Sequence, residues 1–210
     1  ARRNVLSRVS KLRTISGAGR VIMHLTHGAS TKGDRFLAAQ ARPYQGQRTH
    51  GGKPKQWQFL RDWMENYDGP EFEVALWKDR EADDGMAHAC HTAATLRKVL
   101  HVVHTADKDM RMFCGTHVAW NSYAITDVPL GAYDVIGSDH KQYGHKWFWL
   151  QMLQGDTADH IPGLPKVGEE GEEEVLAGTT CSDEGRELVI GKYIDKMGWD
   201  RWADHFVEQA

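Results

Sequence analysis

The stretch FEVALWKDREADD, residues 72–84, decides the predicted fold because it joins a strand pattern to a helix pattern. Apolar and polar residues alternate over 72–77, which is typical of a strand, and a helical pattern follows over 81–98. A second apolar strand is predicted over 100–105 and a short helix over 107–113. Strand, helix, strand and helix in this order indicate an α/β core with parallel strands.

The segments that precede this stretch extend the same core. A short amphipathic helix is predicted over 4–14 and a buried strand over 21–25. Residues 27–53 lack periodicity and are rich in Gly, Gln, Thr and Arg, so they are predicted to form a long loop or a partly helical arch. A helix is predicted over 54–67.

After about residue 140 the pattern changes to helices, with a tight Gly/Pro turn at 161–168. We therefore expect an α/β core over 1–139, with the arch at about 27–53, and a helical region over 140–210. Most of the eight tryptophans are predicted to pack rather than to stack on bases. The apolar residues of the tail are also predicted to be core: Leu188, Val189, Tyr193, Ile194, Met197, Trp199, Trp202 and Phe206.

The net charge of −3 over 210 residues conceals a strong asymmetry. Residues 1–61 hold thirteen Lys/Arg and one acid, Asp34, for a formal charge of +12, and residues 62–210 carry −15. This division indicates a phosphate-binding surface beside a cation-binding centre. The alternative is that the two parts simply neutralise each other in the fold.

Other whole-chain features indicate a cytoplasmic protein. No apolar run approaches the length of a membrane span, and the first residues lack a secretory signal pattern. The cysteines Cys90, Cys114 and Cys181 are odd in number and far apart, which fits reduced thiols better than a disulfide framework or a zinc cluster.

Three acidic clusters stand out: Glu81, Asp83 and Asp84; Asp107 and Asp109; and Asp156 and Asp159. Taken singly, each could cap a helix or form a turn. If the predicted strands are neighbours, the first two clusters converge at one edge of the sheet, where so many carboxylates would repel unless cations were bound. Magnesium prefers oxygen ligands, and two such ions roughly 3.5–4 Å apart can promote phosphodiester hydrolysis.

Three motifs in order, EADD (81–84), ADKD (106–109) and GDTADHIPGLPKVG (155–168), resemble the 5′→3′ exonuclease and flap endonuclease family. The resemblance covers roughly residues 20–178, and ARPYQGQR (41–48) is similar to the basic arch motif of the short phage exonucleases. The 5′-nuclease domain of bacterial DNA polymerase I is another relative. The resemblance implies a PIN-like core, with a central, mostly parallel sheet flanked by helices, and a C-terminal helix–three-turn–helix DNA clamp.

The resemblance also implies roles for individual residues. Glu81, Asp83, Asp84 and Asp107 would serve a first metal centre, and Asp109, Asp156 and Asp159 a second, with two Mg²⁺ ions that Mn²⁺ can replace. Arg48 and Arg35 would be catalytic, and a K⁺ ion would lie at the clamp turn. The implied DNA-binding residues are Tyr44, Gln45, Arg48, Gly163, Lys166 and Gly168.

The implied activity is removal of nucleotides from a 5′ end and cleavage of flaps. Its substrates would be duplex DNA with 5′ ends, nicks or flaps, and RNA in RNA–DNA hybrids. We expect a monomer without a membrane partner, in the bacterial host cytoplasm if a phage encodes it.

Four departures from the family pattern favour an alternative. The family's first strand and its metal-binding Asp are expected to lie before Ala1, and Thr26-His27-Gly28 occupies the place of a second Asp. Gln45 stands where the arch usually has Lys, and an acidic run fills 169–174. The alternative is a weakened or inactive DNA-binding member or fragment of the family. A third possibility is a ribonuclease with a similar acidic α/β core.

Overall fold

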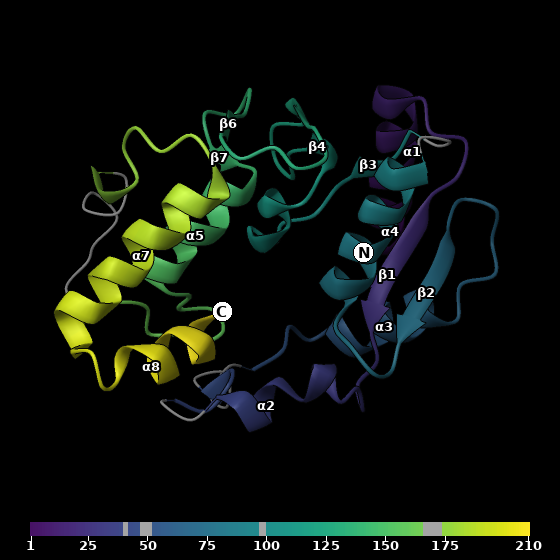
Figure 1. Ribbon diagram of the computed structural model, residues 1–210. Coiled ribbons are helices and arrows are strands. Elements are labelled where there is room, and N and C mark those ends of the chain that lie inside the picture. Colours follow the sequence, from purple (N-terminus) through teal and green to yellow (C-terminus); the bar gives the residue numbers. More distant parts are fainter. Residues whose placement is uncertain (40–41, 47–51, 97–99, 166–173) are drawn as a thin grey trace. The chain divides into compact units, whose positions relative to one another are not determined.

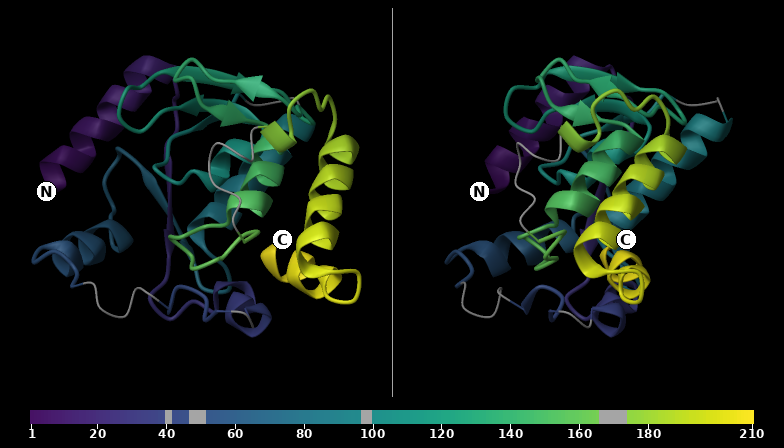
Figure 2. Two further views of the ribbon diagram at one scale, coloured as in Figure 1. Left: turned by 90° about the vertical axis from the view of Figure 1, so that its left-hand side faces the viewer. Right: turned by 60° about the vertical axis from the view of Figure 1, so that its left-hand side comes forward.

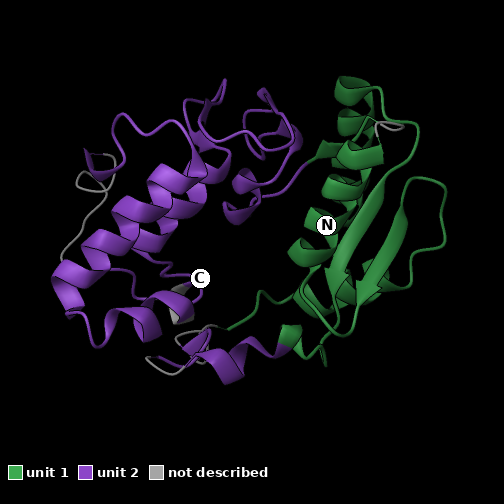
Figure 3. Ribbon diagram, viewed as in Figure 1, with its two compact units in different colours: residues 1–33, 50–103 green, residues 34–49, 104–210 purple. Residues whose placement is uncertain are grey.

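The computed structural model describes residues 1–39, 42–46, 52–96, 100–165 and 174–210. The chain forms two compact units (Figure 3). Unit 1 contains residues 1–33 and 50–103, and unit 2 contains residues 34–49 and 104–210. Both units combine helices with short strands, so the fold class is mixed α/β, as predicted.

Unit 1 is built on two parallel strands, β1 (Ile22–Thr26) and β2 (Glu73–Trp77). Parallel strands need a long connection, and helix α3 (Trp57–Glu65) lies within it. Helix α4 (Ala82–Leu96) packs against both strands (Figure 1). The helices predicted over 54–67 and 81–98 and the strands predicted over 21–25 and 72–77 are therefore confirmed, with shifted ends.

Close packing in unit 1 depends on small and aromatic residues. A Cβ atom at Gly85 of α4 would come within 2.2 Å of the Trp77 ring, so this glycine lets the helix approach β2. Trp63, Tyr67 and Phe72 form an aromatic cluster, and the Tyr67 and Phe72 ring centroids are 3.9 Å apart. Helix α1 (Arg2–Ser16) buries Val9 and is longer than the predicted helix over 4–14.

The strands of unit 2 pair in antiparallel hairpins. β4 (Gly115–Val118) pairs with β5 (Ile125–Val128), and β6 (Val135–Ile136) pairs with β7 (Gln142–Tyr143). These hairpins were not predicted, because strands of two to four residues are too short for a clear alternation. Strand β3 (Val102–Val103), at the end of unit 1, is also shorter than the strand predicted over 100–105.

The described part of the arch contains short helical segments. They are η1 (Lys32–Asp34), which crosses the boundary between the units, and α2 (Arg35–Ala38). The predicted partly helical character is confirmed over these residues, and residues 40–41 and 47–51 lie outside the described chain.

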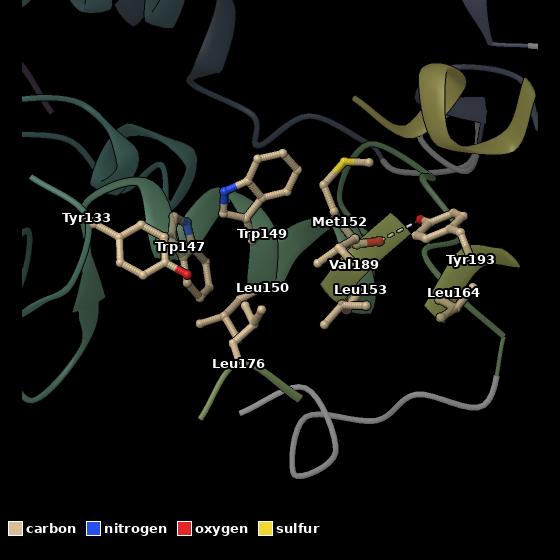
Figure 4. Close-up of a cluster of buried hydrophobic side chains, with 10 residues drawn as sticks. All are labelled: Tyr133, Trp147, Trp149, Leu150, Met152, Leu153, Leu164, Leu176, Val189 and Tyr193. Carbon is tan, nitrogen blue, oxygen red and sulfur yellow. Dashed lines mark hydrogen bonds between the residues drawn. The ribbon is translucent and has the colours of Figure 1, made fainter. Parts of the chain in front are cut away.

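Three helices form the core of unit 2: α5 (His145–Gln154), α7 (Ser182–Met197) and α8 (Trp202–Gln209). Figure 4 shows ten buried residues of this core: Tyr133, Trp147, Trp149, Leu150, Met152, Leu153, Leu164, Leu176, Val189 and Tyr193. The Tyr193 hydroxyl donates to the Met152 carbonyl oxygen at 2.6 Å, near the end of α5. This bond joins α7 to the last turn of α5, where the backbone carbonyl oxygens have no hydrogen-bond donor within the helix.

Two residues of the tail that were predicted to belong to the core are exposed, so the prediction was wrong for them. Trp199 is 72% exposed and Leu188 is 42% exposed. Trp199 follows Gly198, which ends α7, so it lies in the turn before α8 rather than on a packed helix face. Within the described chain, none of the helices is both long enough and apolar enough to pass through a membrane.

Candidate metal centre

Asp109, Asp156 and Asp159 form a group of carboxylates in unit 2. One oxygen from each lies within 4.8 Å of the others, and no other group of at least three His, Cys, Asp or Glu side chains in the described residues meets this geometry. Asp156 is buried, and Asp109 and Asp159 are half-buried. The three acids come from two segments of the chain that are more than 40 residues apart in sequence.

A short 3-10 helix, η3 (Asp109–Met112), positions the first of these acids. Met110 is 1% exposed, and η3 packs against α5, so burial of the methionine anchors the turn that carries Asp109. Asp107 Oδ1 accepts a hydrogen bond from the Asp109 backbone N–H at 3.0 Å. Asp107 itself is exposed and is not one of the three grouped acids.

A tight backbone crossing positions the other two acids. Helix α5 ends at Gln154, and both Gly155 and Gly163 have positive φ. A Cβ at Gly155 would lie 2.4 Å from the Gly163 nitrogen, and a Cβ at Gly163 would lie 2.3 Å from the Gly155 nitrogen. Only glycine allows this approach. Asp156 and Ile161 exchange backbone hydrogen bonds of 2.9 and 2.7 Å, which close the loop that carries Asp156 and Asp159.

The position of the group is electrostatically unfavourable for carboxylates alone. The pKa of Asp109 is raised to about 6, mainly because the carboxyl is buried; the charges of Asp107 and Asp156 also raise this pKa, whereas Gln151 and Lys108 lower it. Asp156 also follows the C-terminal end of α5, where the helix dipole favours positive charge. A cation at this place would relieve both effects.

Polar side chains that the sequence analysis did not single out contact two of these acids. Gln151, on α5, donates from Nε2 to Asp109 Oδ1, and Lys108 Nζ lies 3.4 Å from Asp156 Oδ1. Gln151 is a polar residue within the apolar run of α5, and in the sequence this position indicated that it could have a polar partner. Lys108 stands between two acids in sequence, and its role as a counter-ion could have been proposed from that position.

The arch segment contacts the third acid. Gln45 Nε2 donates to Asp159 Oδ1 at 3.0 Å, and the Tyr44 hydroxyl lies 3.4 Å from Asp159 Oδ2. The Gln45 backbone N–H also donates to the Asp159 carbonyl oxygen at 3.1 Å. Two of the arch residues predicted to bind DNA, Tyr44 and Gln45, are therefore next to a predicted metal ligand in unit 2.

The donor set fits a hard divalent cation. All three side chains offer carboxylate oxygens, without the nitrogen or sulfur ligands that zinc prefers, so Mg²⁺ or Mn²⁺ suits the group. Burial is the largest cause of the elevated pKa of Asp109, and the charges of Asp107 and Asp156 add to it.

Glu81, Asp83 and Asp84 lie in unit 1, at the start of α4. Asp84 Oδ2 accepts from the Glu81 backbone N–H at 3.0 Å, as in a helix cap, and Lys32 Nζ lies 3.7 Å from Glu81 Oε1. Thr26 Oγ1 accepts from the Ala82 backbone N–H at 2.9 Å. Thr26 ends β1, so this residue joins the strand to the first turn of α4.

The remaining predicted site residues fall in three places. Arg35 begins α2 and is half-buried. Gly163 is buried at the backbone crossing, which supplies a structural reason for glycine there. Arg48, Lys166 and Gly168 lie outside the described residues.

Neither the protein-family models nor the curated proteins contain a match to the chain. Solved structures do match it. The T5 D15 protein co-crystallised with metal ions aligns at 14% identity and a TM-score of 0.57, covering 97% of this chain and 85% of that one. The chain is similar in fold to a phage flap endonuclease. T5 5′-exonuclease with bound zinc gives 14% identity, a TM-score of 0.58 and coverages of 97% and 83%.

A complex of the bacteriophage T5 D15 flap endonuclease with DNA and metal ions gives 13% identity and a TM-score of 0.54, with coverages of 97% and 83%. At such identities the likeness shows the fold. The predicted α/β fold of the phage exonucleases is therefore confirmed.

Proposed function

We propose that this chain is a metal-dependent nuclease that hydrolyses phosphodiester bonds of DNA, as a 5′→3′ exonuclease and flap endonuclease. The observation that carries the proposal is the group formed by Asp109 of η3 with Asp156 and Asp159, which follow α5. Similar folds in structures of phage nucleases with metal ions and with DNA support it.

In this proposal Asp109, Asp156 and Asp159 hold a Mg²⁺ ion, which Mn²⁺ can replace. A divalent ion bound there would lower the pKa of a bound water and offset the charge of a substrate phosphate. Gln151 orients the Asp109 carboxylate through its hydrogen bond to Oδ1. Lys108 is a fixed positive charge beside Asp156 and limits repulsion within the group before a metal binds.

The rest of the site is also part of the proposal. Metal binding is also proposed for Glu81, Asp83 and Asp84 of unit 1 and for Asp107 of unit 2, so that two ions serve the reaction, and Arg48 and Arg35 stabilise charge on the scissile phosphate. DNA contacts come from Tyr44, Gln45, Arg48, Gly163, Lys166 and Gly168. Residues 1–139 form the nuclease core, and residues 140–210 form the DNA-binding region with a K⁺ ion at the 161–168 turn.

The proposed substrates are duplex DNA with 5′ ends, nicks or flaps, and RNA in RNA–DNA hybrids. The proposed working form is a monomer in the cytoplasm. Comparing labelled DNA, RNA and hybrid strands under the same conditions separates this proposal from a ribonuclease, which would cleave RNA in preference to DNA.

A cleavage assay on labelled flap and nicked duplexes tests the proposal. The protein should cut with Mg²⁺ and not in chelator, and Asp109→Asn should remove the activity. Asp195→Asn is a matched control, because Asp195 is an exposed acid on α7 outside the group. Absence of magnesium-dependent cleavage at high protein concentration would reject the activity for this chain.

A second candidate is a DNA-binding protein of the same fold without catalysis. Lys108 and Gln45 favour it, because an ammonium and an amide already contact two of the three acids. It predicts salt-sensitive DNA binding that persists in chelator, with no cleavage in Mg²⁺. Magnesium-dependent cleavage that is lost in Asp109→Asn would reject this candidate.

A further inference from the structure

The arch segment 43–46 contacts the loop that carries Asp159, and both belong to unit 2. This loop follows α5 and is closed by the backbone hydrogen bonds that Asp156 and Ile161 exchange. Figure 2 shows it as an irregular stretch, coloured green, beyond the end of α5. Asp159 lies inside the closed turn, so the exchange fixes the backbone around it but not the direction of its side chain.

Two arch side chains contact the two carboxylate oxygens of Asp159. Gln45 Nε2 donates to Oδ1 at 3.0 Å, and the Tyr44 hydroxyl lies 3.4 Å from Oδ2. Gln45 Nε2 also donates to the Tyr44 hydroxyl oxygen at 3.0 Å, so the two side chains form one network. Because a carboxylate has about four lone-pair sites, it can accept from both side chains and bind a cation at the same time.

Main-chain groups attach the same arch segment to the loop. The Gln45 backbone N–H donates to the Asp159 carbonyl oxygen at 3.1 Å, and His160 Nδ1 lies 3.2 Å from the Pro43 carbonyl oxygen. Gln45 and His160 have φ of 53° and 66°, a region that residues other than glycine rarely adopt. Such conformations persist where neighbouring contacts hold them, and here the two segments hold each other.

The other two acids of the group are supported by residues close to the metal centre in sequence or on α5. Gln151 of α5 donates to Asp109, and the Ala158 backbone N–H donates to Asp156 Oδ1 at 2.7 Å. Asp159 is instead contacted by side chains 114 and 115 residues away in sequence. The direction of its carboxylate therefore depends on whether the arch segment is docked.

We propose that the arch segment 43–46 positions Asp159 for the metal ion, so that docking of this segment and binding of a divalent cation stabilise each other. This inference rests on the proposed function, which assigns the cation to the three acids. Hydrogen-bond partners fix the orientation of a ligating carboxylate, and their loss typically lowers metal affinity about 10- to 100-fold. Coupling between two binding events is reciprocal, so the cation also holds the arch segment. Gln45 and Tyr44 are positioning residues, because they act through Asp159.

Direct measurement of Mn²⁺ binding tests this inference without an activity assay. Electron paramagnetic resonance of free Mn²⁺ gives the dissociation constant for the parent and for the arch variant Tyr44→Phe/Gln45→Met. Phenylalanine keeps the ring and methionine keeps the length of the side chain, so the variant loses mainly the hydrogen bonds to Asp159. It should bind Mn²⁺ about 10- to 100-fold more weakly than the parent.

Unit 2 offers a matched control in an adjacent Gln and Tyr that contact other acids. Gln142 Nε2 donates to Asp134 Oδ1 at 3.1 Å, and the Tyr143 hydroxyl donates to Asp139 Oδ2 at 3.2 Å. Neither acid belongs to the metal-binding group. The control variant Gln142→Met/Tyr143→Phe removes hydrogen bonds of the same kind and should keep the Mn²⁺ affinity of the parent. Denaturant unfolding in chelator checks that both variants remain folded.

Hydrogen exchange of the Gln45 backbone N–H measures the coupling from the opposite direction. This N–H donates to Asp159, so its exchange reports whether the arch segment is docked. Mg²⁺ should slow the exchange in the parent and should have no such effect in Asp109→Asn, which lacks one of the three carboxylates. A contact that only stabilises the fold would not respond to the metal.

The outcomes separate this inference from the proposed nuclease activity. Weaker Mn²⁺ binding by the arch variant alone would support it, even if the parent cleaves no DNA. Equal affinities in the arch variant and the control would overturn it, even if the parent cleaves DNA. Tighter binding by the arch variant, or faster Gln45 exchange in Mg²⁺, would show that arch and cation compete for Asp159 and would also overturn it. If the parent binds no Mn²⁺ that Asp109→Asn removes, the metal centre is rejected together with this inference.

Discussion

The acids of unit 1 and the acids of unit 2 have the same spacing in sequence but different surroundings. Glu81 and Asp84 are three residues apart, as are Asp156 and Asp159. The first pair lies at the N-terminal end of α4, where backbone N–H groups and the helix dipole stabilise carboxylates. The second pair follows the C-terminal end of α5, where the dipole has the opposite sign.

This difference shows that spacing alone does not identify a cation site. The carboxylate of Asp84 already caps a helix, so it has a structural role without a metal. Asp156 is buried next to Asp109, whose pKa is raised to about 6, so the group in unit 2 has a stronger need for a cation. Four measurements test whether the two sets of acids differ in this way.

The largest effect is expected on cleavage. Asp156→Asn removes the buried carboxylate of the group, so magnesium-dependent cleavage should fall by more than the roughly 100-fold that is typical for loss of an outer partner. Asp84→Asn should lose at least about tenfold less, because its side chain can still accept the Glu81 hydrogen bond. Equal losses measured on the same flap substrate would contradict the difference between the two sets of acids.

The next effect is expected on stability through the backbone crossing. Gly163→Ala should lower the free energy of unfolding by about 3 kcal/mol or more, because its Cβ would lie 2.3 Å from the Gly155 nitrogen. Gly178→Ala is the control: Gly178 also has positive φ, but a Cβ there meets nothing within 4 Å, so only about 1 kcal/mol of strain is expected. Denaturant unfolding measures both, and similar losses would contradict the role of the crossing.

A smaller effect with the opposite sign is expected for Asp109→Asn in chelator. At pH 7.5 the charged Asp109 destabilises the folded protein, because its folded pKa of about 6 lies above the ordinary 3.8. The full shift would correspond to about 3 kcal/mol, and solvent screening at this half-buried carboxyl reduces the expected gain in stability to about 1 kcal/mol. The difference should shrink as the pH falls through about 6 towards 4, because the parent carboxyl becomes protonated.

Added Mg²⁺ should stabilise the parent more than Asp109→Asn in the same unfolding measurements. The control Asp195→Asn should follow the parent at every pH. If Asp109→Asn is less stable than the parent at pH 7.5 in chelator, hydrogen bonds and charges within the protein already compensate the Asp109 carboxylate.

The smallest effect is expected in unit 1. Thr26→Val keeps the shape of the side chain but removes the acceptor for the Ala82 backbone N–H, so the free energy of unfolding should fall by about 1 kcal/mol. Thr14→Val is the control, because the Thr14 hydroxyl only donates to the Ser10 carbonyl oxygen on the exposed side of α1. An unchanged Thr26→Val melting curve would argue against capping of α4 from β1.

Strong periodicity made the long elements predictable. The alternation over 72–77 and the apolar spacing over 81–98 predicted β2 and α4, whereas the parallel pairing of β2 with β1 was not predicted. The β4–β5 and β6–β7 hairpins were missed, because two to four residues carry little pattern. Trp199 was misplaced because an apolar residue in a turn resembles one on a buried helix face.

The types of the long elements, the acid clusters and the glycines that permit a tight turn are evident from local sequence, because each depends on neighbours within a few residues. Which acids form a group depends on the packing of distant segments, because Asp109 and Asp156 meet only when η3 packs on α5. Such packing also brings Gln151, Lys108 and Gln45 into contact with these acids. The burial and the electrostatic surroundings of Asp109 depend on residues that are distant in sequence, so they cannot be read from the sequence alone.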